Sequence, residues 1–217
     1  MPAHPISQGE ITKDLIKTFL PPNPVIVEAG AHKGRDTIKM AKTWPQGTIH
    51  SFEPVPELFV QLSQATALYP HITCYPYALS TNESEATLYV SSGASTAASS
   101  LLEPHTYRTE RPEVHFTSIK VSTTTLDAWS HLYRVPHVDF LWLDMQGNEL
   151  AALEGGQNLI LDVSALVIEA NLTERFRGAP SYDDILLWAH HHSFKPVLQD
   201  IPKHNKVNIL LVASRLT

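Results

Sequence analysis

The chain has 217 residues, of which 43% are hydrophobic and 18% are charged. This length and composition predict a single globular domain over residues 1–217 and exclude a disordered or fibrous protein. The formal net charge is −6, and the 16 Lys and Arg residues are scattered along the chain. A nucleic-acid partner is therefore not expected, because binding to a phosphate backbone needs a basic stripe.

The lone cysteine, Cys74, excludes both a disulfide framework and a cysteine-based zinc site. The first residues lack the basic start and the apolar core of a signal peptide. No apolar run approaches the length of a membrane span. We expect a soluble, cytoplasmic protein without a membrane partner.

The N-terminal segment 1–23 is expected to hold an amphipathic helix. Ser7 and Glu10 have the spacing of a capping box, and apolar residues follow at helical intervals. The helix should end before the prolines at 21 and 22.

The next part of the chain alternates between strand and helix patterns. Three strands are expected: a continuous apolar run typical of a buried strand at 25–29, and short strands at 48–53 and 72–75. Two helical patterns separate them: 34–42 and 57–68. This alternation predicts a parallel sheet with right-handed crossovers. The segment that follows the third strand, up to residue 90, is expected to form a hairpin.

Segment 91–120 has no clear periodicity, and a loop this long is functional or mobile. We interpret it as an inserted lid or substrate-facing loop, with simple disorder as the alternative. Regular patterns then return. Strands are expected at 119–123, 138–144, 164–170, 194–198 and 207–213, and helices at 126–133, after residue 144, and at 182–192.

The first strand ends in an acid and runs into a turn of small residues. Gly30 and Ala31 let a ligand approach the main chain closely, and Gly34 lets the following helix pack against the strand. The turn lacks the three-glycine pattern of a dinucleotide site. Glu28 would repel phosphate and suits a ligand with an amino group or a positive charge. The alternative is a structural turn with a solvated glutamate.

The second strand also ends in an acid. Glu53 lies nineteen residues beyond Gly34, where a carboxylate can accept hydrogen bonds from both hydroxyls of a ribose. An amino or cationic end combined with a ribose describes S-adenosylmethionine. A nicotinamide-dependent oxidoreductase is the alternative, since Glu53 would suit the ribose of that cofactor too.

Five segments, taken in order, resemble the FkbM-type methyltransferase family over about residues 24–212: "VEAGAHKGRDT", "FEPVPELFVQL", "YALS", "TTTLDAW" and "VDFLWLDMQGNELAALEGG". The resemblance implies an α/β, Rossmann-like class I methyltransferase fold. That fold has a mostly parallel seven-stranded sheet with an antiparallel last strand and helices on both faces. The resemblance further implies O-methylation of a hydroxyl on a sugar, glycan or natural-product-like small molecule.

The resemblance also assigns cofactor-binding residues. It places Glu28, Gly30, Ala31 and Gly34 in the first cofactor motif, His32 where the family usually has Asn, Glu53 on the ribose, and Pro54 and Ala78 beside the adenine. His32 is the largest departure from the family pattern, because its charge varies near neutral pH.

Candidate catalytic residues follow the fourth and fifth strands. Asp144 is expected to contact the reacting end of the cofactor or the acceptor hydroxyl and to act as the base, with His105 or His115 from segment 91–120 as alternatives. Glu149 is either a functional acid or a carboxylate that stabilises a helix start.

Glu169 and Asn171 end the fifth strand and should face Asp144. This set loosely resembles the magnesium ligands of catechol-type O-methyltransferases. A divalent metal is less favoured than hydrogen bonding to the acceptor. The run of histidines at 190–192 is expected to be a solvated helix end, because consecutive helical residues point in different directions. A catalytically silent binding domain with the same fold is the remaining alternative.

Overall fold

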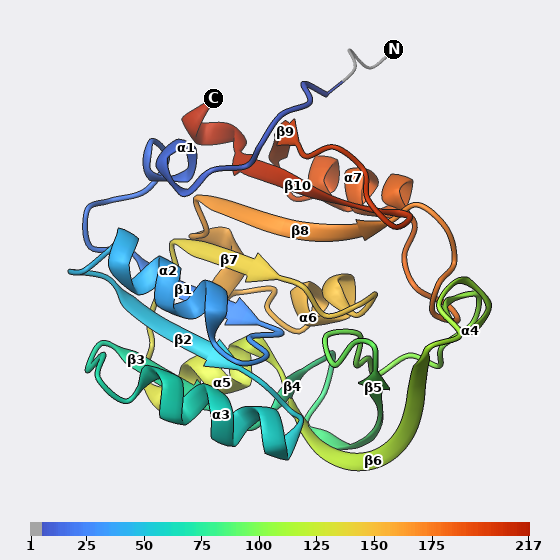
Figure 1. Ribbon diagram of the computed structural model, residues 1–217. Helices are drawn as coiled ribbons and strands as arrows, with labels where there is room; N and C mark the ends of the chain where they lie inside the picture. Colours follow the sequence, from blue (N-terminus) through green and yellow to red (C-terminus); the bar gives the residue numbers. More distant parts are fainter. Residues whose placement is uncertain (1–5) are drawn as a thin grey trace.

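The computed structural model describes residues 6–217 and contains two sheets. The main sheet has seven strands in the order β3-β2-β1-β7-β8-β10-β9. These strands are β1 (Val25–Ala29), β2 (Thr48–Phe52), β3 (Ile72–Tyr75), β7 (Phe140–Leu143), β8 (Ala165–Asn171), β9 (Phe194–Gln199) and β10 (Lys206–Ala213). The smaller sheet has three strands in the order β4-β6-β5 and lies beside the carboxyl end of the main sheet (Figure 1).

Helices cover both faces of the main sheet (Figure 1). These helices are α1 (Lys13–Lys17), α2 (Arg35–Thr43), α3 (Pro56–Thr66), α5 (Leu126–Tyr133), α6 (Glu149–Glu154) and α7 (Tyr182–His191). The short helix α4 (Tyr107–Glu110) lies beside the small sheet instead, and there are two 3-10 turns, η1 (Leu159–Leu161) and η2 (Ser214–Leu216). No helix among residues 6–217 has the length and apolar character needed to cross a bilayer.

Two apolar cores explain why the central strands are continuous apolar runs. Alternate residues of each strand point to opposite faces. In β1, Val27 packs with α5, α6 and α7 on one face, and Ile26 packs with α1 and α2 on the other. Every residue of β8 is buried. The predicted parallel sheet with helices on both faces is confirmed.

The last strand reverses direction. β10 runs antiparallel to both of its neighbours, β8 and β9, whereas β1 is parallel to β2 and β7. The predicted seven-stranded sheet with an antiparallel last strand is therefore confirmed. A consequence is that the start of β10 lies at the edge where the parallel strands end, with Lys206 opposite Asn171.

The N-terminal helix differs from its prediction. It covers only α1, and its N-cap is Thr12, whose hydroxyl accepts a hydrogen bond from the backbone N–H of Leu15. The capping box expected at Ser7 and Glu10 is therefore wrong. The part of the prediction that falls on residues 1–5 lies outside the described residues.

The region after β3 also differs. β4 (Ala78–Leu79) and β5 (Ser84–Gly93) do not pair with each other as a hairpin; both pair with β6 (Val114–Thr124). The prediction of an irregular segment 91–120 is wrong at both ends, because β5 extends into it and β6 begins within it. Between the two strands lie α4 and residues 94–102, which cross the carboxyl edge of the main sheet and are called the crossing stretch below (Figure 1).

A clasp of two short segments, 103–110 and 173–177, fastens the small sheet to the loop after β8. The backbone N–H groups of His105 and Tyr107 both donate to the carbonyl of Arg175. The Arg175 side chain is buried over the Tyr107 ring and pairs with Glu110. In Figure 1 the loop between β8 and α7 reaches down to α4, which is the place of the clasp.

Candidate active site

The turn after β1 brings its backbone against the end of β7. Gly30 has a positive φ of 85°, and its N–H and that of Ala31 both donate to the carbonyl of Phe52. A Cβ on Gly30 would lie 1.9 Å from the carbonyl oxygen of Asp144. Only glycine fits there, because any side chain would push the ends of β1 and β7 apart.

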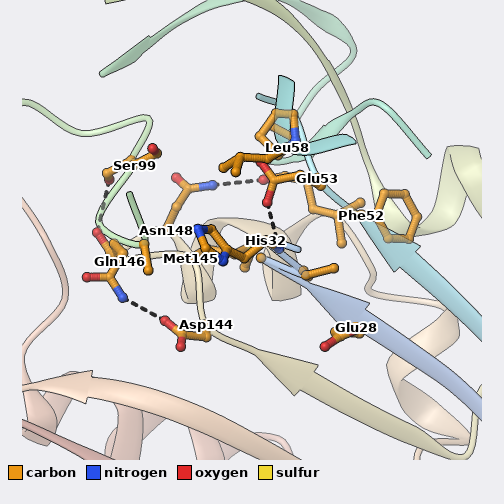
Figure 2. Close-up of a pocket in the computed structure, with 18 of the residues that line it drawn as sticks. Glu28, His32, Phe52, Glu53, Leu58, Ser99, Asp144, Met145, Gln146 and Asn148 are labelled. Carbon is orange, nitrogen blue, oxygen red and sulfur yellow. Dashed lines mark hydrogen bonds between the residues drawn. The ribbon is translucent and has the colours of Figure 1, made fainter. Parts of the chain in front are cut away.

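Glu28 is buried beneath this turn, with 2% of its surface exposed. Its Oε2 accepts hydrogen bonds from the hydroxyls of Thr37, at 2.5 Å, and Ser51, at 2.9 Å. Burial raises the pKa of Glu28 to about 7, against the effect of these two hydrogen bonds. The alternative of a solvated glutamate is therefore wrong, and the carboxyl faces the cavity from its floor (Figure 2).

Glu53 lies across the cavity at the end of β2 and is also buried. Its Oε2 accepts from the backbone N–H of His32, at 2.8 Å, and its Oε1 from that of Val55, at 2.9 Å. Burial raises the pKa of Glu53 to about 7. Each carboxylate oxygen has two lone pairs, so acceptor capacity remains for ligand hydroxyls.

His32 sits in the left-handed region with φ 52°, where asparagine is far better tolerated than most residues. Its Nε2 lies 2.9 Å from the hydroxyl of Thr96, in the stretch that crosses the sheet edge. Burial and the neighbouring Lys33 lower the pKa of His32. The imidazole therefore ties the cofactor turn to segment 91–120, a contact that the sequence did not indicate.

These groups surround one cavity of about 220 Å³ (Figure 2). Of the residues assigned to the cofactor, those that line it are Glu28, Gly30, Ala31, His32, Glu53, Pro54, Ala78 and Asp144. Gly34 does not line the cavity. It has a positive φ of 81° at the start of α2, where a Cβ would lie 2.9 Å from Leu62, so it serves the packing of that helix.

Sequence reasoning missed the apolar wall of the cavity. Next to Pro54 and Ala78 it is formed by Leu58, Leu79, Leu88 and Leu101, which come from α3, β4, β5 and the crossing stretch. An apolar wall of this kind suits the flat face of an adenine. The only sequence signal for this wall was the apolar residues of α3 and β5. Their position at the cavity depends on how the small sheet packs.

Asp144 follows β7 at the cavity edge and is linked to Glu169 through one amide. The Nε2 of Gln146 donates to Asp144 Oδ1, at 2.6 Å (Figure 2). The same nitrogen donates to Glu169 Oε1, at 2.7 Å. Among residues 6–217, no hydrogen bond engages the second oxygen of Asp144, Oδ2. Asp144 and Glu169 thus lie at the same edge of the sheet, as adjacent strand ends predict, but they do not face one another directly because Gln146 lies between them.

Glu169 is buried and forms an ion pair with Lys206. Burial and the charge of Asp144 raise the pKa of Glu169 to about 8, although the Lys206 ammonium opposes this shift. Asn171 is buried beside Gly147, and its Oδ1 has no hydrogen-bond partner among residues 6–217. Neither Glu169 nor Asn171 lines the cavity itself.

Glu149 has a local task. Its carboxylate accepts from the backbone N–H of Met145, at 2.7 Å, and from that of Gly147, at 2.9 Å. Burial raises the pKa of Glu149 to about 7. It holds the loop between β7 and α6 in shape, so the structural alternative describes it better than the functional one.

The histidines outside the turn lie away from the cavity. His105 pairs with Glu174 in the clasp, and His115 is exposed on β6. The histidines at 190–192 end α7, as expected for a helix end, and none of these five lines the cavity. The prediction of His105 or His115 as an alternative base would require the clasp and the small sheet to move.

The comparison with protein families decides what kind of site this is. Residues 28–196 match the family described as "Methyltransferase FkbM domain". The chain belongs to the FkbM methyltransferase family. It is therefore an S-adenosylmethionine-dependent methyltransferase, and the oxidoreductase alternative for Glu53 is set aside.

Among characterised proteins, this methyltransferase is 23% identical over 180 residues to the 2-O-methyltransferase NoeI of Sinorhizobium fredii, covering 80% of this chain and 74% of NoeI. Solved structures share its fold. One is an rRNA methylase from Streptococcus thermophilus, with TM-score 0.52, 12% identity, and coverage of 94% of this chain and 99% of that one.

Another is a Streptococcus pneumoniae protein assigned as a tRNA (m1A22) methyltransferase and solved with S-adenosyl-L-methionine. Its TM-score is 0.53 and its identity 13%, with coverage of 92% of this chain and 71% of that one. At these identities the likeness to solved structures concerns the fold.

The residues around the cavity fit S-adenosylmethionine. Glu28 offers a buried carboxyl to an amino or cationic group, and Glu53 offers acceptors to ribose hydroxyls. The leucine wall offers an apolar surface to the adenine, and Asp144 lines the same cavity.

Proposed function

We propose that this methyltransferase transfers a methyl group to a hydroxyl oxygen of a sugar, a glycan or a natural-product-like small molecule. The observation that carries the proposal is Asp144 at the carboxyl edge of β7. One oxygen of its carboxylate is fixed by Gln146, and the other, Oδ2, has no hydrogen bond within residues 6–217. A fixed carboxylate with a free oxygen can accept the proton of a hydroxyl.

S-adenosylmethionine supplies an electrophilic methyl group on a positively charged sulfur. The protein has to hold the acceptor oxygen in line with that methyl group. As the new O–C bond forms, the hydroxyl proton passes to Asp144 Oδ2, and the electron pair of the broken S–C bond stays on sulfur. Asp144 later releases the proton to water.

Asn171 supports an acceptor rich in hydroxyl groups. It is 4% exposed, and its Oδ1, at the end of β8 and two residues beyond Glu169, accepts no hydrogen bond from the part of the chain that the structure describes. A buried amide oxygen without a partner is costly unless a ligand supplies the donor. We assign Glu169 to the support of Asp144 and Asn171 to a hydroxyl of the acceptor. Because Asn171 does not line the cavity, that contact requires the acceptor to displace part of the cavity wall.

Two observations support the proposed kind of acceptor: the net charge of the chain and its match to NoeI. NoeI is named as a 2-O-methyltransferase, and its resemblance supports oxygen as the methylated atom. Two of the structural relatives are named for RNA, but they share only the fold. The scattered cations of this chain, with net charge −6, favour a neutral acceptor over a nucleic acid.

Asp144→Asn tests the proposal. The purified protein is incubated with S-adenosylmethionine and a panel of methyl glycosides and polyols, and S-adenosylhomocysteine is quantified. The substitution should lower kcat by about a hundredfold or more while the Kd for S-adenosylmethionine changes little. Asp162→Asn, on the exposed turn after η1, is the matched control and should behave as wild type. An unchanged kcat would clear Asp144 of the proton-transfer role.

A thermal-shift assay separates the remaining alternatives. Stabilisation by S-adenosylmethionine and S-adenosylhomocysteine together with turnover of a hydroxyl compound supports the proposal. Stabilisation without turnover of any compound in the panel favours a silent binding domain. Stabilisation by NAD alone would contradict the assignment of Glu28 and Glu53.

A further inference from the structure

Lys206 begins β10 and has no counterpart in the sequence-based predictions. Because β10 is antiparallel to β8, its first residue lies at the edge where the parallel strands end. The side chain is partly buried, with 29% of its surface exposed, and its ammonium contacts Glu169 Oε2. The reversed strand thus brings a cation to the catalytic edge of the sheet.

Lys206 is the first member of a chain of four side chains, which we call the edge network: Lys206, Glu169, Gln146 and Asp144. Lys206 contacts one oxygen of Glu169, and Gln146 Nε2 contacts the other at 2.7 Å. The same Nε2 donates to Asp144 Oδ1 at 2.6 Å. The network therefore runs from β10 through β8 to the carboxylate at the cavity.

The edge network does not fit the divalent metal considered for Asp144, Glu169 and Asn171. Both oxygens of Glu169 and one oxygen of Asp144 already accept from nitrogen donors. Within residues 6–217, no three His, Cys, Asp or Glu side chains converge as a ligand set. A divalent cation bound to Glu169 would also be repelled by the Lys206 ammonium.

The geometry points to Lys206 as a positioning residue of methyl transfer, which supplies the positive charge at this edge in place of a metal ion. Gln146 donates through one amide nitrogen to both carboxyls, so the position of Glu169 sets the position of Gln146. Lys206 holds Glu169 in place through Oε2 and so fixes the orientation of Asp144 Oδ2. This inference rests on the proposed role of Asp144.

The groups around Lys206 and Glu169 include some that raise and some that lower the pKa of each residue. Burial disfavours the ammonium of Lys206, but Asp144 and Glu169 outweigh it and raise the pKa of Lys206, while Arg175 in the clasp opposes them. At Glu169, burial and the charges of Asp144 and Glu149 favour the protonated form, and Lys206 favours the ionised form. Removing Lys206 should therefore raise the pKa of Glu169 further.

Kinetics of Lys206→Met and Lys206→Arg test the inference. Lys206→Met should lower kcat at pH 7.5 by about tenfold or more, with the Kd for S-adenosylmethionine nearly unchanged. Its pH–rate profile should also shift upward relative to the wild type, because the pKa of Glu169 rises when Lys206 is removed. Lys206→Arg keeps the charge and should restore most of kcat. Lys203→Met, on the exposed turn before β10, is the control.

EDTA and added Mg²⁺ should leave the wild-type rate unchanged, and Mg²⁺ should not rescue Lys206→Met. Loss of wild-type activity in EDTA with recovery in Mg²⁺ would overturn the inference, as would a Lys206→Met variant with wild-type kcat and pH profile. If the wild type methylates no hydroxyl compound, the proposed function fails first, and the inference fails with it.

Unfolding by urea gives a second measurement that does not depend on activity. Lys206→Met leaves Glu169 buried without its cation and should lower stability, whereas adding Glu169→Gln should restore much of it. Additive effects of the two substitutions would show that the pair is not coupled and would contradict the edge network.

Discussion

At the scale of single residues, buried carboxyl groups fix the backbone around the cavity through hydrogen bonds. Glu53 binds the N–H groups of His32 and Val55, and these two bonds join the turn after β1 to the end of β2. Glu53 also lines the cavity. One side chain therefore shapes the turn beside the cavity, and the ribose contact proposed for it would use the remaining lone pairs of the same carboxylate.

Glu53→Ala should weaken S-adenosylmethionine binding by about ten- to a hundredfold, the range expected when hydrogen bonds to a charged group are lost. Isothermal titration calorimetry measures the change. Glu57→Ala, on the exposed face of α3 four residues later, should leave the affinity unchanged. An unaltered Kd in Glu53→Ala would remove Glu53 from the ribose.

His32→Asn tests the link between the cofactor turn and the crossing stretch. Asparagine suits the left-handed backbone at this position, and the N–H bond to Glu53 does not involve the side chain. The lost bond to Thr96 should speed amide exchange in residues 94–101 by about two- to tenfold, while cofactor affinity is retained.

Thr96→Val breaks the same contact from the other side and should give the same exchange pattern by mass spectrometry. If His32→Asn alone lowers cofactor affinity, the imidazole contacts the cofactor directly and the link to Thr96 is secondary.

At the scale of elements, the ends of β1 and β7 can approach closely because Gly30 has no side chain. Gly30→Ala would force a Cβ to within 1.9 Å of the Asp144 carbonyl, so the strands must separate. We expect a loss of about 3 kcal/mol in unfolding free energy, together with loss of cofactor binding. Urea unfolding and calorimetry measure both.

Gly178→Ala is the control that measures backbone strain in the absence of a steric clash. Gly178 also has a positive φ, 74°, but a Cβ there would meet nothing within 4 Å. Its substitution should cost only about 1 kcal/mol, the price of the left-handed backbone alone. Equal effects at the two positions would mean that the approach of Asp144 to Gly30 does not limit stability.

The elements that the sequence predicted well are those that form the main sheet. Runs such as Val25–Ala29 and Ala165–Asn171 are buried on both faces, so burial alone makes them continuous and apolar. β6 was missed in part because most of Val114–Thr124 is exposed or half-buried and gives no clear alternation. Its pairing with β4 and β5 depends on contacts distant in sequence.

The same distinction applies to the site. Glu28, Glu53 and Asp144 could be predicted because the carboxyl ends of parallel strands share one edge. The edge network could not, because Lys206 reaches Glu169 only through the register of an antiparallel strand. Likewise, no local pattern indicates that His32 would meet Thr96.

At the scale of the whole molecule, four buried glutamates give stability an unusual dependence on pH. Burial raises the pKa of Glu28, Glu53 and Glu149 to about 7 and that of Glu169 to about 8. In the unfolded chain these groups titrate near 4.5. Between pH 6.5 and 8.5 the folded protein therefore holds protons that the unfolded chain has already released.

The sign of the effect follows from that difference. A state that binds more protons is favoured at low pH, so each carboxyl stabilises the fold below its unfolded pKa and loses this contribution as pH rises through its folded pKa. The lowered pKa values of His32 and His50 act in the opposite direction, but only below pH 6.5. Above that pH, the glutamates dominate.

The unfolding free energy should thus fall by about 1 to 3 kcal/mol per pH unit near pH 7, as one to two extra protons leave the folded state. Urea unfolding at pH 6.5, 7.5 and 8.5 measures this slope. Glu28→Gln removes one of the titrating groups and should flatten the slope, whereas Glu57→Gln should not. A stability that is constant or rises over this range would mean that the four carboxyls are already ionised in the folded protein. Counter-charges such as Lys206 would then outweigh burial at the catalytic edge.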